Sequence, residues 1–231
     1  MSDIINVSVM LLEYIKKIRN SPKWYHRALF LLWEYDYVAS LPERREEAKR
    51  FIMGGESGEW QSVYDKPVEQ QYIDSPLYKR MEELLSFVNK KYTVIQLGAA
   101  RGREIKYFRD KYPQHEYIAT DIVPHGDVVK LDVRDIKKFV RGLQNVIIFT
   151  NGVLEYVQPE YISKFFRDTA GYKVLIYEPV IMKGGKMYFG YRENFAWSHN
   201  YWAASAEFRD IIYFKMNQTT DNAGCVFMEV V

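Results

Sequence analysis

Short apolar runs alternate with helical segments from Tyr92 through the middle of the chain, and this alternation constrains the fold more than any other feature. The runs are rich in β-branched and aromatic residues, and three of them are followed directly by Gly98, Asp121 or Asp132. Strands that alternate with helices predict a parallel sheet with right-handed crossovers. The predicted strands are residues 92–97, 116–120, 127–131, 145–150 and 172–177, and the predicted helices between them are 104–111, 134–141 and 159–169.

The last part of the chain has a different pattern. Residues 210–216 and 225–231 are two strand-like runs, and the loop between them is rich in turn formers. A parallel return would need a dozen or more residues, so these strands are expected to pair as an antiparallel hairpin. The expected fold is therefore α/β: a Rossmann-like three-layer sandwich with a mostly parallel seven-stranded sheet and a C-terminal antiparallel hairpin.

The region before the alternating pattern is helical in character. Apolar residues recur at three- and four-residue steps in residues 4–18, and Ser21-Pro22 is a typical helix start. A further start signal, Asp74-Ser75-Pro76, follows the glycine-rich joint at residues 54–58. We expect a helical N-terminal extension or cap over residues 1–75 and a core domain over residues 76–231.

Composition excludes several classes of protein. The formal net charge is only +2 over 231 residues, so no nucleic-acid partner is expected. The longest apolar runs are far shorter than the roughly 20 residues that cross a bilayer, and no signal peptide is evident, so we expect a cytoplasmic protein without a membrane partner. Cys225 is the only cysteine, which excludes an internal disulfide and a cysteine-based metal cluster, and no metal is expected.

Residues that directly follow parallel strands carry the functional information, because ligands of open α/β sheets bind at the carboxyl ends of the strands. The turn after the first strand reads Gln-Leu-Gly-Ala-Ala-Arg-Gly over residues 96–102. A dinucleotide fingerprint needs glycines at its first, third and sixth positions, but here these are Gly98, Ala100 and Arg103. No phosphate-binding Gly-Lys-Ser/Thr follows either. The turn therefore suits a nucleoside without a pyrophosphate, and an NAD-dependent oxidoreductase is disfavoured.

Residues 93–102 resemble motif I of class I, S-adenosylmethionine-dependent methyltransferases, in which an apolar strand precedes acid-x-Gly-x-Gly-x-Gly. The resemblance extends over about residues 70–231 and implies S-adenosyl-L-methionine as cofactor. It implies that Asp121, with Ile122 beside it, binds the ribose hydroxyls, and that Asp132 and Val133 border the adenine. The backbone around Gly98 and Ala99 would contact the methionine portion. The other candidate cofactor-binding residues are Gln96, Ala100 and Gly102 in the turn and Asn151 and Gly152 after the fourth strand. Asp132 could equally cap the following helix.

Two positions depart from the family motif. Gln96 stands where the family has an acid. Its side chain can still hydrogen-bond the turn or an ammonium group, but it carries no negative charge. Ala100 replaces the middle glycine, which is tolerated if its backbone angles are ordinary. These departures motivate an alternative reading, a non-catalytic methyltransferase-like binding or regulatory module.

Methyl transfer is an in-line displacement, so the protein mainly aligns the acceptor and, for a hydroxyl, removes its proton. His199 is the best candidate for that base, since imidazole titrates near neutrality; the alternative is a histidine that hydrogen-bonds locally. Residues 179–206 are long enough to form a lid, with a helix near residues 200–208. Candidate substrate-binding residues are Trp60, Tyr64, Tyr72, Glu155, Glu178 and Tyr201, although the aromatic ones could instead pack on the core.

The sequence therefore predicts an enzyme, a methyltransferase that acts on a small molecule at a hydroxyl oxygen. A helical cap, an aromatic-rich lid and a near-neutral charge favour such a substrate over a nucleic acid. Homodimer formation is left open.

Overall fold

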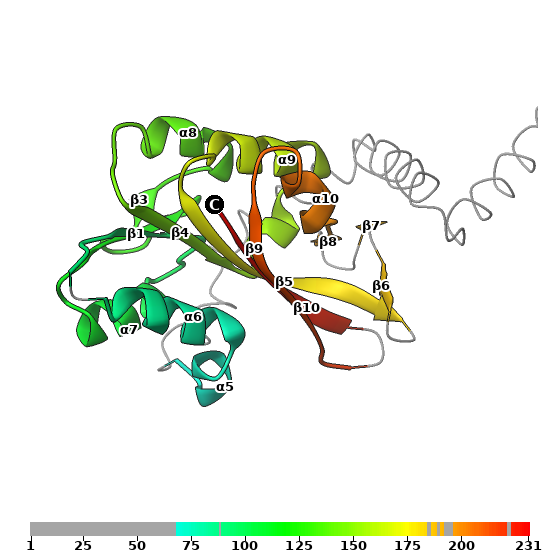
Figure 1. The fold of residues 1–231 in the computed structure, drawn as a ribbon, viewed down its shortest axis with the longest axis horizontal. Helices are drawn as coiled ribbons and strands as arrows, with labels where there is room; N and C mark the ends of the chain where they lie inside the picture. Colours follow the sequence, from blue (N-terminus) through cyan, green and yellow to red (C-terminus); the bar gives the residue numbers. More distant parts are fainter. Residues whose placement is uncertain (1–67, 88, 184–185, 189, 192–195, 221–222) are drawn as a thin grey trace, which may run out of the picture. The chain divides into compact units, whose positions relative to one another are not determined.

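The computed structural model describes residues 68–231 except 88, 184–185, 189, 192–195 and 221–222 (Figure 1). The predicted N-terminal helices, Trp60 and Tyr64 lie outside the described residues. The described part begins with α5 (Gln70–Ile73) and α6 (Pro76–Leu85). The latter helix starts as its sequence predicts, because Pro76 occupies its first turn and the Ser75 hydroxyl accepts a hydrogen bond from the Tyr78 amide at 3.4 Å.

A central sheet holds the fold together. Its path runs β3-β2-β1-β4-β5-β10-β9, with β6 paired to β5 outside that path. β1 (Thr93–Leu97), β2 (Glu116–Asp121), β3 (Val129–Lys130), β4 (Val146–Asn151) and β5 (Lys173–Lys183) are parallel. β10 (Ala223–Val230) is antiparallel both to β5 and to β9 (Ile211–Gln218). The predicted Rossmann-like sheet with its antiparallel hairpin is confirmed.

Helices cover both faces of this sheet (Figure 1). α5, α6 and α7 (Arg103–Lys111) lie on one face, which we call the α6 face. α8 (Ile136–Phe139), α9 (Pro159–Asp168) and α10 (Tyr201–Ser205) lie on the other, the α9 face. Two large hydrophobic clusters fill the layers, one with Val94 and Ile147 under α6 and one with Ile95 and Ile148 under α9, and a third, smaller cluster contains Ile105 of α7 and Ala119 of β2. The two large clusters take alternate residues of each strand, as the two-residue period of a strand requires.

The segment after the fifth strand differs from the expected lid loop. β5 continues to Lys183, because Val180 and Met182 are buried in the cluster on the α9 face. It then pairs with β6 (Lys186–Tyr188), and β7 (Gly190–Tyr191) pairs with β8 (Trp197–Ser198). Much of the expected loop is therefore sheet. The predicted helix at residues 200–208 is shorter, and the predicted strand at 127–131 shrinks to the two residues of β3.

No helix within the described ranges is long and apolar enough to cross a membrane.

Candidate functional site at the carboxyl ends of the strands

The order of the sheet reverses between β1 and β4. From β1 the chain proceeds outward to β2 and β3, whereas β4 lies on the other side of β1 and leads to β5. The crossover helices of the two halves therefore lie on opposite faces of the sheet. Such a switch point leaves a crevice at the carboxyl ends of the two central strands, where open α/β sheets bind their ligands.

The turn from β1 into α7 has three residues in the left-handed region. Gly98 has φ 63°, Gly102 has φ 71° and Ala100 has φ 49°. Hydrogen bonds hold the turn, from the Ala99 amide to the Thr120 carbonyl at 2.8 Å and from the Gly102 amide to the Ala99 carbonyl at 2.7 Å. The condition set for Ala100, ordinary backbone angles, is therefore not met. Its left-handed conformation costs about 1–2 kcal/mol, which the rest of the turn has to offset.

Gly98 is needed here for close packing as well as for its φ. A Cβ at Gly98 would lie 2.3 Å from Cγ2 of Val153, in the segment that follows β4. The missing side chain thus lets Val153 approach the turn; a ligand contact at Gly98 stays a prediction. The loop after β4 and the turn after β1 are packed directly against each other.

Asp121, at the end of β2, lies beside this turn. Its Oδ2 accepts a hydrogen bond from the Ala100 amide at 2.8 Å, and its Oδ1 accepts one from the Val123 amide at 3.0 Å. The carboxylate thus holds the strained residue in place. A carboxylate offers about four lone-pair sites, so each oxygen can still accept one hydrogen bond from a hydroxyl group. Ile122, next to it, is partly buried.

On the other side of the turn, Gln96 connects β1 to α7. Its side-chain oxygen accepts a hydrogen bond from the Ile105 amide at 3.0 Å, and its Nε2 donates to the Glu104 carboxylate at 2.5 Å. Glu104 also accepts from Asn151 Nδ2 at 2.6 Å and from the Tyr78 hydroxyl at 2.9 Å. Gln96 and Asn151, at the ends of β1 and β4, therefore meet on one carboxylate across the switch point.

Sequence reasoning missed Glu104. It is partly buried, and burial raises the pKa of its carboxyl, while hydrogen bonds from Asn151, Tyr78 and Gln96 and the charge of Arg103 act in the opposite direction. The only signal in the sequence was an acid in the first turn of the helix after the motif, which is common because helix N-termini favour negative charge.

A second buried carboxylate lies on the α9 face. Glu178 on β5 is fully buried and accepts hydrogen bonds from the Thr150 hydroxyl at 2.5 Å and from the amides of Val153 and Glu155 at 3.2 and 3.3 Å. Burial raises its pKa to about 7, although these hydrogen bonds oppose the shift. Glu178 therefore holds the loop after β4, including η3 (Leu154–Tyr156), in position.

Asp132 has the capping role that the sequence left as its alternative. Its Oδ1 accepts a hydrogen bond from the Arg134 amide at 2.9 Å at the start of η2 (Val133–Asp135), and its carboxylate forms an ion pair with the Arg134 guanidinium. Burial acts to raise the pKa of Asp132, but the bonds to Arg134 outweigh it and lower the pKa. Val133 is partly buried and packs against the cluster on the α9 face. An adenine contact for these two residues stays a prediction.

His199 is buried, with 1% of its surface exposed. Its Nε2 lies 3.0 Å from the Leu154 carbonyl, so this nitrogen carries the proton and donates. Burial lowers the pKa to about 3, against hydrogen bonds to Leu154 and Val157. A base of that strength is poorly matched to proton transfer near neutrality. These features favour the local hydrogen-bonding role over the catalytic one.

The remaining candidate substrate residues are spread over the site and the core. Tyr201 is 1% exposed and packs edge-on against His199 in the cluster on the α9 face, which favours a packing role. Tyr72, on α5, packs partly buried on the α6 face, where its pKa is raised by burial and by the charges of Glu69 and Glu104. Glu155 is buried beside Gly152, whose added Cβ would lie 3.5 Å from the Glu155 Oε1.

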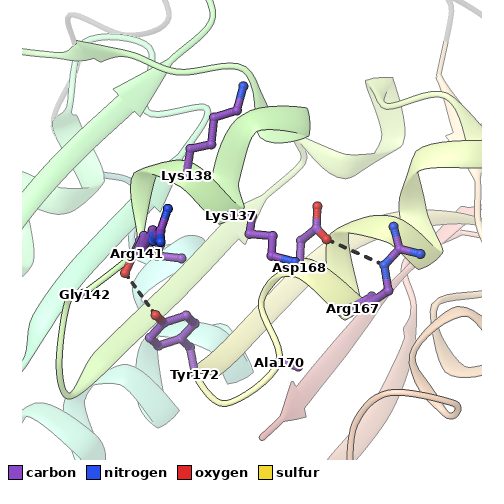
Figure 2. A pocket seen from close by; sticks show the side chains of 9 residues that line it. Lys137, Lys138, Arg141, Gly142, Arg167, Asp168, Ala170 and Tyr172 are labelled. Atoms are coloured by element: carbon purple, nitrogen blue, oxygen red, sulfur yellow. Dashed lines mark hydrogen bonds and ion pairs between the residues drawn. The ribbon is translucent and has the colours of Figure 1, made fainter.

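A hollow of about 600 Å³ lies at the amino ends of the strands, between the segments that lead into β4 and β5 (Figure 2). The ion pair between Arg167 and Asp168 and the hydrogen bond from the Tyr172 hydroxyl to the Val140 carbonyl cross its lining. None of the candidate cofactor residues lines it. It is lined by Lys137, Lys138, Val140, Arg141, Gly142, Arg167, Asp168, Ala170 and Tyr172.

Comparison with known proteins gave structural likenesses alone. No protein family and no curated protein matches the sequence. A methyltransferase from Archaeoglobus fulgidus described as SAM dependent is 10% identical over 65% of this chain and 91% of its own, with a TM-score of 0.44. Magnesium protoporphyrin IX methyltransferase from Synechocystis, with bound SAM, is 12% identical over 83% and 98%, with a TM-score of 0.47.

Phosphoethanolamine N-methyltransferase 2 from Haemonchus contortus is 11% identical over 66% of this chain, with a TM-score of 0.44. This chain spans about half of that protein, 52% of its length. With TM-scores below 0.5, these likenesses carry no weight for function, which has to follow from the residues at the switch point.

Proposed function

We propose that this chain is an S-adenosylmethionine-dependent methyltransferase that acts on a small-molecule acceptor. The observation that carries the proposal is the arrangement around the glycine turn. Asp121 lies on the β2 side of the turn, and Glu104 lies on the β4 side, joined to Gln96 and Asn151. The turn lacks the fingerprint of a pyrophosphate-binding loop, and a carboxylate flanks it on each side. This arrangement at a switch point suits a nucleoside that carries a cationic substituent.

The described residues fit S-adenosylmethionine. Asp121 has an acceptor site left on each oxygen for the two ribose hydroxyls, and the turn residues Gly98–Gly102 border the same crevice. When bound, the cofactor supplies the electrophilic methyl group. This chain's own part is to bind and orient the cofactor, to align the acceptor and to exclude water.

A hydroxyl oxygen is the acceptor that we propose, as part of a small molecule rather than a nucleic acid. The near-neutral net charge of +2 supports this substrate class. Glu155 lies in the loop after β4, and Glu178 lies beside that loop on β5. Glu178 already accepts hydrogen bonds from Thr150 and from two amides of the loop. A cytoplasmic location remains part of the proposal.

A non-catalytic binding module is the second candidate. It is favoured by the burial of His199, the best candidate in the sequence for the base that removes a hydroxyl proton. Such a module would bind the cofactor, or a nucleoside related to it, without turnover.

Calorimetric titration of the full chain with S-adenosylhomocysteine and with 5′-methylthioadenosine tests the cofactor proposal. We expect both to bind, and we expect Asp121→Asn to weaken both equally, because both contain the ribose. Glu82→Gln is the matched control: its carboxylate lies on α6 and pairs with Lys111 and Tyr107 away from the turn, so we expect no effect. Failure of the unmodified chain to bind either compound at millimolar concentration would exclude both candidates. Binding without methyl transfer to a panel of small-molecule hydroxyl compounds would favour the second.

A further inference from the structure

The motif lacks an acid at position 96, and an acid from the next helix lies directly beside that position. Gln96 has no charge, yet the carboxylate of Glu104 lies 2.5 Å from its Nε2. Glu104 is the second residue of α7 and follows Gln96 by eight positions, so a linear motif does not include it. The glycine turn brings the two side chains together on the α6 face.

Hydrogen bonds from uncharged groups hold the carboxylate of Glu104 in place. Three neutral donors bind it, the amides of Gln96 and Asn151 and the hydroxyl of Tyr78. Among the ion pairs found within the described residues, none includes Glu104. The charge of Arg103 acts on it at longer range. Three of about four lone-pair sites are used, and Oε2 retains one.

A partly buried carboxylate that forms no ion pair with any described residue is costly to keep charged for structure alone, because removing a charge from water has to be offset by pairing; the raised pKa of Glu104 reflects this cost. Gln96 and Asn151 place this anion between the ends of β1 and β4, in the crevice itself. A ligand with an ammonium group would satisfy the remaining acceptor site and supply the missing charge.

We propose that Glu104 binds the α-ammonium group of the methionine portion of S-adenosylmethionine, in place of the acid that position 96 lacks. This rests on the proposed function. Asp121 and Glu104 then hold the two ends of the same ligand from opposite sides of the turn, the ribose on the β2 side and the ammonium group on the β4 side. Gln96 and Asn151 are positioning residues, which orient the carboxylate.

The hydrogen-bond pattern allows an exchange of the two side chains. In the double variant Gln96→Glu/Glu104→Gln, Glu at 96 accepts from the Ile105 amide and from the new amide at 104. Gln at 104 accepts from Tyr78 and Asn151. Every hydrogen bond of the network keeps a donor and an acceptor, while the charge moves back to the strand. The single variant Glu104→Gln removes the charge.

The test is a calorimetric comparison of two ligands, S-adenosylhomocysteine, which has the ammonium group, and 5′-methylthioadenosine, which lacks it. We expect Glu104→Gln to weaken binding of S-adenosylhomocysteine by about tenfold to a hundredfold, typical of a lost hydrogen bond to a charged group. Binding of 5′-methylthioadenosine should change less than about twofold, a shift too small to reflect a lost charged contact. The double variant should regain most of the lost affinity.

Glu82→Gln serves as the matched control, because Glu82 is a carboxylate on α6 that pairs with Lys111 and Tyr107 away from the turn. It should leave both affinities unchanged. Equal weakening of both ligands by Glu104→Gln, or no weakening, would overturn the inference while leaving the cofactor proposal intact. If the unmodified chain binds neither ligand, both fail. Thermal unfolding of each variant without ligand separates loss of folding from loss of binding.

Discussion

The carboxylate of Glu178 on β5 accepts a hydrogen bond from the hydroxyl of Thr150 on the neighbouring strand β4. Both side chains are fully buried on the α9 face, opposite the cluster around Glu104. The same carboxylate binds amides of the loop after β4, so one acidic group connects two strands and the loop that packs on Gly98. Burial raises its pKa to about 7, which makes this connection sensitive to pH.

We expect Glu178 to make stability fall as pH rises. Its folded pKa of about 7 exceeds the ordinary value of 4.5, so the folded state binds more protons between these values. The free energy of unfolding therefore decreases between about pH 4.5 and 7, by at most about 3 kcal/mol, and then levels off. Urea denaturation of the wild type and of Glu178→Gln across pH 4.5–8 measures this. The difference between the two should show the decrease, and a difference independent of pH would contradict the raised pKa.

Glu229 on β10 should be the most costly carboxylate to neutralise. It is fully buried and forms ion pairs with Arg80 and Lys173, both at 2.6 Å. Glu229→Gln takes the buried partner away from both cations, and Arg80 retains only its exposed ion pair with Glu83, so we expect a loss of about 3 kcal/mol in the free energy of unfolding at pH 7.

The control for this prediction is Glu83→Gln, because Glu83 pairs with the same Arg80 but is 63% exposed. It should cost less than about 1 kcal/mol. Burial acts to raise the pKa of Glu229, but hydrogen bonds from Arg80 and Lys173 outweigh it and lower the pKa. Its contribution is therefore present above about pH 4.5 and lost as pH falls further, and chemical denaturation at pH 7 and pH 3.5 checks both the size and the sign.

Ala100→Gly should stabilise the protein. The left-handed conformation costs alanine about 1–2 kcal/mol, and glycine removes this cost. Glycine also increases the conformational freedom of the unfolded chain, which lowers the gain by about 0.4–1 kcal/mol. We expect a net gain of about 0.5–1 kcal/mol, measured by urea denaturation. Ala99→Gly is the matched neighbour, without a positive φ, and should destabilise. A loss of stability in both variants would mean that Ala100 is not strained.

Gly98→Ala should destabilise the protein for two separable reasons. The new Cβ would lie 2.3 Å from Cγ2 of Val153, and alanine would have to adopt φ 63°. Together these should cost about 2–5 kcal/mol. The double variant Gly98→Ala/Val153→Ala removes the two closest contacts, with Cγ1 and Cγ2, leaves the Cβ of residue 153 at 3.1 Å and retains the backbone cost, so part of the loss should be recovered relative to Val153→Ala alone. Additive effects of the two substitutions would show that the two residues do not touch.

The fold could be predicted because the strands are marked by short-range patterns. Residues 93–97 and 146–151 are apolar runs bounded by turn formers, and the two-residue period assigns their side chains to the two faces. The extension of β5 to Lys183 could not be predicted, because Pro179 interrupts the pattern and the gain comes from distant contacts of Val180 and Met182. In the structure that proline lies inside the sheet, opposite Cys225 of β10.

The candidate site was predictable only in part, for a similar reason. Asp121 follows its strand directly, so its place beside the turn follows from topology alone. The contacts of Glu104 with Gln96 and Asn151 depend on the path of the turn and on the packing of α7, which a linear motif does not record. For His199 the residue type alone suggested a general base, because imidazole titrates near neutrality. Its protonation state in the fold depends on burial beside Leu154, which the sequence does not record.

The position of β10 in the sheet imposes an order on folding. Within the described strands, β9 has no neighbour except β10, and β10 occupies the space between β9 and β5. During synthesis β9 therefore emerges without a place to dock, and β5 presents an open edge until residues 223–230 have left the ribosome. A nascent chain halted before that point would hold a parallel half-sheet with an exposed edge, the species most prone to pair with a second chain and most dependent on chaperones.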